Sequence, residues 1–473
     1  QSRSSAASDV YKRQAGVFDA CDTIVAATDA SREGEMLFRY LYRFLGCRKP
    51  CLRLWISSLT DEAIAKGMEN LRPCSLFDNL FLAADSRNKA DWLLGVNSSY
   101  AVCKAVGFGN NSLGRVQTPV LAAISGRYRE RENHIPADSW PVFVSLCKNG
   151  KIIKMRHVED FCNRRDALEL YEDCKAAGYA RITAVNSRTE EITAPALYNL
   201  TGLQKDANRY HNLTAIRVQE ITQSLYEKKL ISCPRTSSRL LPGDVYDMLP
   251  PVMEKLLSGK EFRQYAGIVD LAARKGVTGN QDTAEHHAIV ITGIQPGELD
   301  REERLVYTLV VGRMLETFMP PCKVEYTTVE AVCAARKFRI RTYRILEAGW
   351  LGIFQRERLV AEDNDLCPVP PELFREEKLP VTGCSLIHRK SLPAAPYTDE
   401  ELADYMDKTG LGTASTRTNI IRTLLERKYI RYSGKYIIPT PKGLLLYETV
   451  RGMKVADASL TSGWEAELAR IEQ

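Results

Sequence analysis

The order of strand-like and helical segments constrains the fold of this chain most strongly. From residue 140, the stretch "WPVFVSLCKNGKIIKMRHV" alternates apolar and polar residues around Asn149 and Gly150, a dipeptide that strongly favours a β-hairpin. Helical periodicity then runs from about 197 to 320, and a second β-rich stretch, "KVEYTTVEAVCAARKFRIRTYRIL", covers 323–346. This order predicts one helical domain inserted between two segments of a single β domain.

The amino-terminal region predicts an α/β unit. "TIVAAT" (23–28) indicates a short buried strand, and "DASREGEMLFRYLYRFLG" (29–46) carries apolar residues at helical spacing. Further helices are predicted at 60–71, 78–106 and 114–133. Together with the alternation further along the chain, these segments predict a multidomain fold of the α/β and α+β classes.

The carboxyl-terminal region has the outline of a winged helix. In "TASTRTNIIRTLLERKYIRYSGKYIIPT", a helix at about 416–427 leads into two short strands joined at Ser433 and Gly434. In a winged helix bound to nucleic acid, Arg417, Asn419 and Arg422 would face phosphates and base edges. The alternative is an ordinary helix and hairpin with solvated charges.

Composition and length indicate a globular protein with more than one domain. A chain of 473 residues is too long for one hydrophobic core, and 44% apolar with 26% charged residues is typical of soluble globular proteins. No apolar run reaches the roughly 18 residues of a membrane helix, so we expect a cytoplasmic protein without a membrane partner. The net charge of +6 is compatible with nucleic acid. The 13 cysteines contain no CxxC pair and are expected to be free, mostly buried thiols.

An acidic turn follows the first predicted strand. Asp29, Glu33 and Glu35 stand at the carboxyl end of that strand, where α/β folds place ligands of divalent metals. Mg²⁺ binds through a few carboxylates together with water and phosphate oxygens, and Asp29 and Glu33 are the preferred candidates. The alternative is that these acids only stabilise the start of the helix through its dipole.

Three other stretches carry residues suited to phosphate chemistry. "SCPRTSS" (232–238) puts Arg235 two residues after Cys233, which is the pairing of nucleophile and phosphate-binding arginine that covalent phosphoryl transfer needs. In "AEHHAIVIT" (284–292), a histidine could donate a proton during transfer. In "LGRVQTP" (113–119), Arg115 could grip a phosphate bidentately. The alternatives are a turn with a buried thiol, a structural histidine and a surface arginine.

Taken together and in this order, these stretches resemble the type IA DNA topoisomerases, and among them the topoisomerase III branch. The resemblance extends from about residue 21 to the carboxyl end. The motifs that carry it are "ATDASREGE", "LWISSLT", "ADWLLGVN", "LGRVQTP", "LYNLTGLQKDANRY", "ITQSLYEKKLISCPRTSSRLL", "EHHAI", "YTDEELADYM", "GLGTASTRTNII" and "LTSGWEAEL".

The resemblance implies a toroidal architecture. Its expected parts are a non-native or adaptor-like tail (1–14), a partial Toprim domain (15–105), the first base segment (106–138), the first gate segment (139–196), a helical nucleophile-bearing domain (197–321), the second gate segment (322–390) and the second base segment with the winged helix (391–473). Such enzymes cleave one DNA strand through a covalent 5′-phosphotyrosine link, pass another strand and religate without ATP.

The resemblance also implies roles for individual residues. The Mg²⁺ ligands would be Asp29 and Glu33, Arg235 would bind the scissile phosphate, and His286 would assist the transfer. The residues expected along the single-stranded DNA path are Arg115, Gln117, Thr416 and Arg417. Tyr226 corresponds to a structural tyrosine of the family. The implied protein is a monomer, and a helicase is a candidate partner.

This chain departs from the family pattern at catalytic positions. Where the family has the nucleophilic tyrosine, this chain has Cys233, and where it has a second aspartate, this chain has Ser31. The family's opening strand, with a catalytic glutamate and lysine, would lie ahead of residue 15, and we interpret the sequence as a fragment truncated at both ends. The departures leave open a catalytically impaired relative that only binds single-stranded DNA. Another Toprim enzyme, such as a primase or nuclease, would explain the acidic turn but not "GRVQTP", "PRTSS" or "GLGTASTRT".

Overall fold

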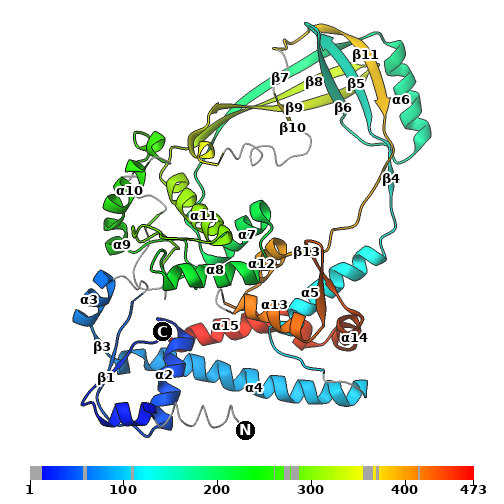
Figure 1. The fold of residues 1–473 in the computed structure, drawn as a ribbon. Helices are drawn as coiled ribbons and strands as arrows, with labels where there is room; N and C mark the ends of the chain where they lie inside the picture. The colour runs from blue at the N-terminus through cyan, green and yellow to red at the C-terminus, as the bar shows by residue number, and fades with distance from the viewer. Residues whose placement is uncertain are drawn as a thin grey trace.

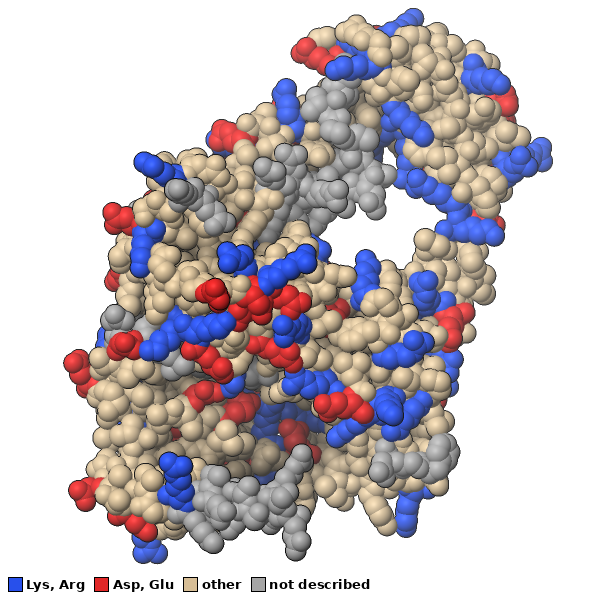
Figure 2. All heavy atoms as spheres, in the orientation of Figure 1, with Lys and Arg blue, Asp and Glu red and all other residues tan. Residues whose placement is uncertain are grey.

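The chain forms a ring in the computed structural model (Figure 1). The structure describes residues 13–56, 61–107, 111–259, 262–270, 277–278, 287–354, 366–368, 372–413 and 416–472. Long strands rise from a helical part to a sheet at the far end of the ring, and the chain returns from that sheet to a base (Figure 1). Figure 2 shows an opening that passes through the molecule between sheet and base, with Lys and Arg side chains along part of its rim.

The amino-terminal part of the described chain is an α/β unit, as predicted. Its elements are β1 (Ile24–Ala26), α2 (Arg32–Phe44), β2 (Cys51–Arg53), α3 (Asp61–Glu69), β3 (Arg72–Pro73), η1 (Cys74–Phe77) and α4 (Asp78–Val106). β1 pairs parallel to β2, and β2 pairs antiparallel to β3. A small core of Ile24, Ala26, Phe38 and Cys74 lies between this sheet and the helices.

The prediction that the cysteines are free and mostly buried is wrong in part. Cys51 and Cys74 form a disulfide, because the pairing of β2 with β3 brings their Cα atoms to 5.6 Å. Ten further cysteines are free thiols among the described residues, and only four of them are buried: Cys174, Cys233, Cys322 and Cys333.

The two predicted gate segments contribute strands to one sheet, and the helical part lies between them in the sequence. The strands are β5 (Val142–Lys148), β6 (Lys151–His157), β7 (Tyr179–Ile192), β8 (Cys322–Cys333), β9 (Arg336–Glu347), β10 (Leu366–Pro368) and β11 (Lys378–Leu386). The order is β10-β9-β6-β5-β11-β7-β8, and β8 also pairs with β9, so the sheet closes on itself. The predicted turn at Asn149 and Gly150 joins β5 to β6, with both residues at positive φ.

One helix of the gate was not predicted. α6 (Arg164–Ala176) is capped by Asn163, whose side chain accepts a hydrogen bond from the Asp166 amide, and it buries Ala167, Leu170 and Cys174 against the sheet. These buried residues recur at helical spacing. The predicted gate segment, 139–196, therefore contains a helix as well as strands.

The inserted helical part has its own hydrophobic core. Its helices are α7 (Leu200–His211), α8 (Ala215–Glu227), α9 (Gly243–Asp247), α10 (Leu249–Ser258), η2 (Arg263–Tyr265) and α11 (Arg301–Thr317), and η3 (Gly349–Gly352) follows β9. α11 begins with a capping box in which Asp300 and Glu303 satisfy each other's backbone amides. Val218, Leu309 and Met314 are fully buried in this core.

The base combines residues from both of its predicted segments. Its elements are α5 (Gln117–Glu132), β4 (Asp138–Ser139), β12 (Arg389–Lys390), β13 (Tyr397–Thr398), α12 (Asp399–Lys408), α13 (Arg417–Glu426), β14 (Ile430–Ser433), β15 (Tyr436–Pro439), α14 (Pro441–Val450), η5 (Lys454–Ala456) and α15 (Ala458–Glu472). One core joins Val120 and Ile124 of α5 to Ile421 and Leu446. α13, β14 and β15 confirm the predicted helix and hairpin.

The ring is closed where the helical part docks on the base. Gln204 of α7 donates a buried hydrogen bond of 3.0 Å to the Thr418 hydroxyl, and Lys205 pairs with Asp404. Arg422 of α13 pairs with Glu220 of α8 at 2.9 Å.

In the described part of the chain, no helix combines the length and the apolar character needed to cross a membrane.

Candidate functional site

The acidic turn after β1 is held by a helix cap and a close backbone contact. Ser31 caps α2, because its hydroxyl accepts a hydrogen bond of 3.1 Å from the Gly34 amide. The Thr28 hydroxyl donates to the Gly34 carbonyl at 2.8 Å. A Cβ at Gly34 would lie 2.1 Å from the Asp29 carbonyl oxygen, so this position requires glycine.

A buried ion pair fixes the backbone of the same turn. Arg53 and Glu35 are both fully buried, and the Arg53 Nε lies 3.0 Å from a Glu35 carboxylate oxygen. The Arg53 guanidinium also donates to the carbonyls of Thr28 at 2.7 Å and Asp29 at 2.6 Å. Glu35 therefore has a structural role here, and Asp29 and Glu33 are the carboxylates of the turn that remain accessible.

Asp29 meets the predicted phosphate-binding arginine across the boundary between two parts of the chain. The Arg235 guanidinium forms an ion pair with the Asp29 carboxylate and also donates to the Gln223 side chain at 3.3 Å. Both charged side chains keep partial exposure, 40% for Arg235 and 45% for Asp29. The structure thus brings together two residues that lie 206 positions apart in the sequence.

The segment that carries Cys233 is anchored to the helical part. The Ser232 hydroxyl donates to the Ala288 carbonyl at 3.1 Å and accepts from the Val290 amide at 3.0 Å. This pairing brings the segment after "EHH" beside Cys233. His287 is buried, with its Nδ1 2.7 Å from the Ala288 carbonyl oxygen. The predicted His286 lies outside the described residues.

The Cys233 thiol is placed where a thiolate is disfavoured. The residue is 5% exposed. The pKa of Cys233 is raised to about 11, chiefly by burial and also by the nearby Asp29 carboxylate, against the opposing effects of the Arg235 amide and guanidinium. Tyr226, the predicted structural tyrosine, packs against the helical core, and burial raises its pKa as well. Neither side chain is an activated nucleophile in this arrangement.

This burial predicts slow alkylation of Cys233. With a pKa of about 11, roughly 0.1% of the thiol is ionised at pH 8, and the thiolate fraction rises about tenfold per pH unit up to the pKa. Iodoacetamide at pH 8 should therefore label the exposed Cys21 and Cys162 and spare Cys233. Mass spectrometry of peptides labelled between pH 8 and 10 measures the three rates. Equal rates at the three cysteines at pH 8 would contradict the buried thiol.

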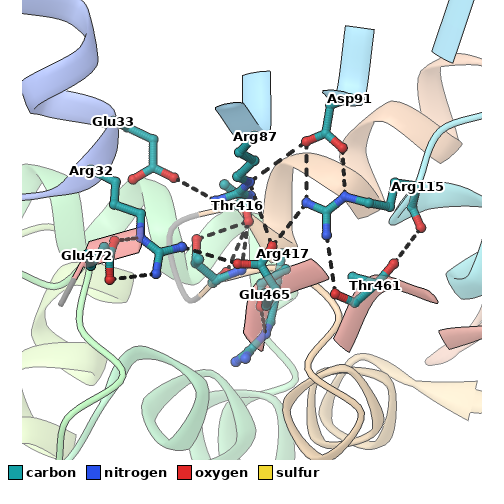
Figure 3. A network of polar contacts seen from close by, with 12 residues as sticks. Arg32, Glu33, Arg87, Asp91, Arg115, Thr416, Arg417, Thr461, Glu465 and Glu472 are labelled. Carbon is teal, nitrogen blue, oxygen red and sulfur yellow. Dashed lines mark hydrogen bonds and ion pairs between the residues drawn. The ribbon is translucent and has the colours of Figure 1, made fainter. Parts of the chain in front are cut away.

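A network of arginines and carboxylates borders the acidic turn (Figure 3). Glu33 pairs with Arg87 of α4 at 3.2 Å. Arg115 is fully buried and lies 2.7 Å from Asp91 and 3.0 Å from Glu465 of α15. The network continues through two further pairs, Arg32 with Glu465 and Arg32 with Glu472. It joins α2, α4, the loop before α5 and α15, which are far apart in sequence.

The structure places the four predicted DNA-path residues in contacts within the protein. Arg115 lies in the network just described, and the side-chain oxygen of Gln117 accepts a hydrogen bond from Arg427. The Thr416 hydroxyl accepts from the Thr413 amide at 2.9 Å. Arg417 is 8% exposed and pairs with Asp407 at 2.7 Å. DNA binding by these four residues stays a prediction.

The predicted Mg²⁺ site has suitable but few ligands. Asp29 and Glu33 keep 45% and 38% of their side chains exposed, and Mg²⁺ needs only one or two carboxylates when water and phosphate supply the other oxygens. Ser31 contributes a cap and no carboxylate. Among the residues that the structure describes, no three His, Cys, Asp or Glu side chains gather closely enough to hold a metal ion. The two carboxylates fit Mg²⁺ as a partner shared with phosphate.

Several residues of this site were not singled out from the sequence. Arg53, Arg87 and Glu465 each contact a predicted residue or its backbone, but each lies in an ordinary helix or strand. Their partners are between 24 and 350 positions away. No local pattern marks Arg53 or Arg87, whereas Glu465 lies within the quoted motif "LTSGWEAEL" and only its partner was not predicted.

Comparisons with known proteins identify the family. The model of the DNA topoisomerase family matches residues 75–473. The chain belongs to the DNA topoisomerase family. The matched range includes Cys233 and Arg235 and begins after the acidic turn. The resemblance predicted from the sequence is confirmed at this level.

Individual relatives agree with the family match. The chain is 30% identical over 479 residues to DNA topoisomerase 3 of Bacillus licheniformis, 30% over 482 to that of Bacillus subtilis and 32% over 482 to that of Bacillus cereus. Each alignment covers 95% of this chain, and the chain spans 65% of the length of these relatives. Full-length topoisomerase I from Thermotoga maritima shares the fold, with a TM-score of 0.79 at 20% identity over 98% of this chain and 77% of that one. The predicted fold class is confirmed.

Proposed function

We propose that the protein is a topoisomerase III-like type IA enzyme whose complete form cleaves, passes and religates single DNA strands without ATP. The contact between Arg235 and Asp29 carries the proposal. It puts a phosphate-binding guanidinium against a carboxylate of the acidic turn, at the boundary between the helical and amino-terminal parts. A scissile phosphate at this boundary would bind the Arg235 guanidinium in place of Asp29, because two phosphate oxygens can accept a pair of charge-assisted hydrogen bonds from it.

For the chain with Cys233, we propose DNA binding without cleavage. The buried, protonated thiol is a weak nucleophile, and its sulfur lies several ångströms short of where a tyrosine oxygen would act. This observation favours the impaired relative over an active cysteine variant. Under this proposal, only a protein with tyrosine at position 233 would relax or decatenate DNA.

The proposed cofactor is Mg²⁺, held by Asp29 and Glu33 together with a DNA phosphate. Bound there, the ion would neutralise phosphate charge near the cleavage point. Arg235 would orient the phosphate, and Arg87 would keep the Glu33 carboxylate turned toward the α4 side of the turn. Ser31 would position the helix without adding a negative charge.

We further propose the setting in which the enzyme works. Its substrate is single-stranded DNA exposed in the cytoplasm. The ring closes within one chain through contacts such as Gln204 with Thr418, which supports a monomer. A helicase that supplies single strands is the proposed partner.

Binding of oligonucleotides tests the proposal. A fluorescein-labelled single strand should bind more tightly than its duplex, with an affinity that falls steeply with salt because phosphate contacts release counterions. Arg235→Ala should weaken binding about tenfold, since it removes a charged hydrogen-bond partner. Fluorescence anisotropy measures both affinities. The matched control is Arg336→Ala, an exposed arginine in the hairpin between β8 and β9. A preference for duplex, or no binding of either form, would reject the proposal.

A further inference from the structure

A disulfide lies beside the acidic turn. It joins Cys51 of β2 to Cys74, the first residue of η1, which is 23 positions later in the sequence. In a reducing cytoplasm, which is the setting proposed above, disulfides are usually transient and serve catalysis or redox sensing. A disulfide in that setting is therefore expected to open and close, and its neighbours show what its opening would change.

One end of the disulfide is joined to the acidic turn through its own strand. Arg53 stands two residues after Cys51 in β2. Its guanidinium donates to the carbonyls of Thr28 at 2.7 Å and Asp29 at 2.6 Å, and its Nε lies 3.0 Å from the Glu35 carboxylate. Because these contacts fix the backbone of the turn, any displacement of β2 is passed on to it.

The other end reaches the same turn through a second arginine. The Cys74 carbonyl accepts a hydrogen bond from the Arg39 guanidinium. Arg39 also pairs with Glu35 of α2 and with Asp78 of α4, both at 2.8 Å. The two routes meet at the buried Glu35 carboxylate, and the disulfide joins them at their far ends. Strand, arginines and turn thus form one closed chain of contacts.

The disulfide can be opened without unfolding this part of the chain. Cys51 is partly exposed, whereas Cys74 is only 5% exposed, so a reductant meets Cys51 first. Beyond the disulfide, the rings of Trp55 and Phe77 stack with their centroids 4.9 Å apart. This stack does not depend on the disulfide, and it keeps β2 beside η1 after reduction. Reduction is therefore expected to loosen the turn and to leave the fold intact.

We propose that Cys51 and Cys74 are a reversible redox site that controls how firmly the acidic turn is held. The reductant is a dithiol. Its first thiolate attacks the Cys51 sulfur, the S–S bond breaks, and Cys74 leaves as a thiolate that takes up a proton. Its second thiolate then displaces Cys51, which takes up the other proton, and the reductant leaves as a cyclic disulfide. The cysteine pair gains the two electrons and two protons that the dithiol loses.

The two redox states differ in the support of the proposed metal ligands. In the oxidised state a covalent bond completes the chain of contacts around the turn, and in the reduced state only hydrogen bonds and ion pairs hold it. The inference rests on the proposed function, in which Asp29 and Glu33 bind Mg²⁺ and meet a DNA phosphate. It makes the redox state of the surroundings a regulator of that site.

Hydrogen exchange of the full chain tests the inference. The chain is compared in glutathione disulfide and in dithiothreitol, and mass spectrometry of alkylated peptides records whether Cys51 and Cys74 are bonded. Reduction should speed the exchange of the amides in residues 24–35 about tenfold or more, because loss of a crosslink raises the population of locally open states. Oxidation of the reduced chain should restore the slow exchange.

Substitutions and distant amides supply the controls. Cys47→Ser removes a free thiol that packs against the same small core, and it should leave the response to dithiothreitol unchanged. Cys51→Ser combined with Cys74→Ala should exchange at the reduced rate in both buffers. Amides of β5 and β6, which lie in the gate sheet, should exchange equally in both buffers.

The outcomes separate this inference from the proposed function. Equal exchange of residues 24–35 in the two buffers would overturn it, as would free thiols at Cys51 and Cys74 in glutathione disulfide. The unaltered chain decides this alone, so the result stands if the double variant does not fold. The exchange is measured without DNA, so a chain that responds to reduction but binds no oligonucleotide overturns the proposed function and leaves the redox site in place.

Discussion

Replacing Arg53 with leucine is expected to lower the free energy of unfolding of the amino-terminal part by about 3–5 kcal/mol. Arg53 and Glu35 have no exposed side-chain surface, so the substitution takes away one of the two arginines that pair with the buried carboxylate and leaves only Arg39, 2.8 Å from its other oxygen. The carbonyls of Thr28 and Asp29 lose their donor at the same time. Hydrogen exchange of the β1 and β2 amides under increasing urea measures the change, because it reports this part separately from the rest of the ring.

A double variant provides the control for this prediction. Arg53→Leu combined with Glu35→Leu removes both buried charges, and it should recover part of the lost stability because a buried pair is often replaced by apolar residues at little cost. If Arg53→Leu changes the unfolding free energy by less than about 1 kcal/mol, the ion pair does not hold the acidic turn.

The elements that were predicted correctly carry strong local signals. Asn149 and Gly150 require a turn with positive φ, and the strands on either side followed directly. The predicted helix at 78–106 coincides with α4, which ends at Gly107 in a left-handed conformation. The winged-helix outline was predicted from the helix pattern and the Ser433–Gly434 turn, and the three elements occur in that order.

The features that escaped prediction depend on distant partners. The burial of Arg115 could not be predicted, because its partner Glu465 lies 350 positions later in the sequence and meets it only in the folded base. The accessible carboxylates of Asp29 and Glu33 after the first strand could be predicted, and their role as metal ligands stays a prediction. The buried Arg53 that holds the backbone of this turn could not be predicted, since an arginine in a strand has no distinctive pattern. A charged residue is buried only when tertiary packing supplies its partner.

Restoring tyrosine at position 233 is expected to convert a DNA-binding chain into one that forms a covalent link to DNA. The charges of Asp29 and Arg235 act on the Cys233 thiol, so a tyrosine side chain at this position would bring its hydroxyl toward the same pair. Its phenol would reach the phosphate held by Arg235, whereas the thiol stays buried and protonated. Cys233→Phe is the matched control, because it adds the same ring without the hydroxyl.

The most direct measurement is a denaturing gel that detects protein-linked DNA. The unaltered chain, Cys233→Tyr and Cys233→Phe would each be incubated with a labelled single strand and Mg²⁺, and all three would carry the opening strand of a relative ahead of residue 15. We predict an adduct for the tyrosine variant alone, mapped to residue 233. An adduct at Cys233 of the unaltered chain, or none for a tyrosine variant that still binds DNA, would contradict the account.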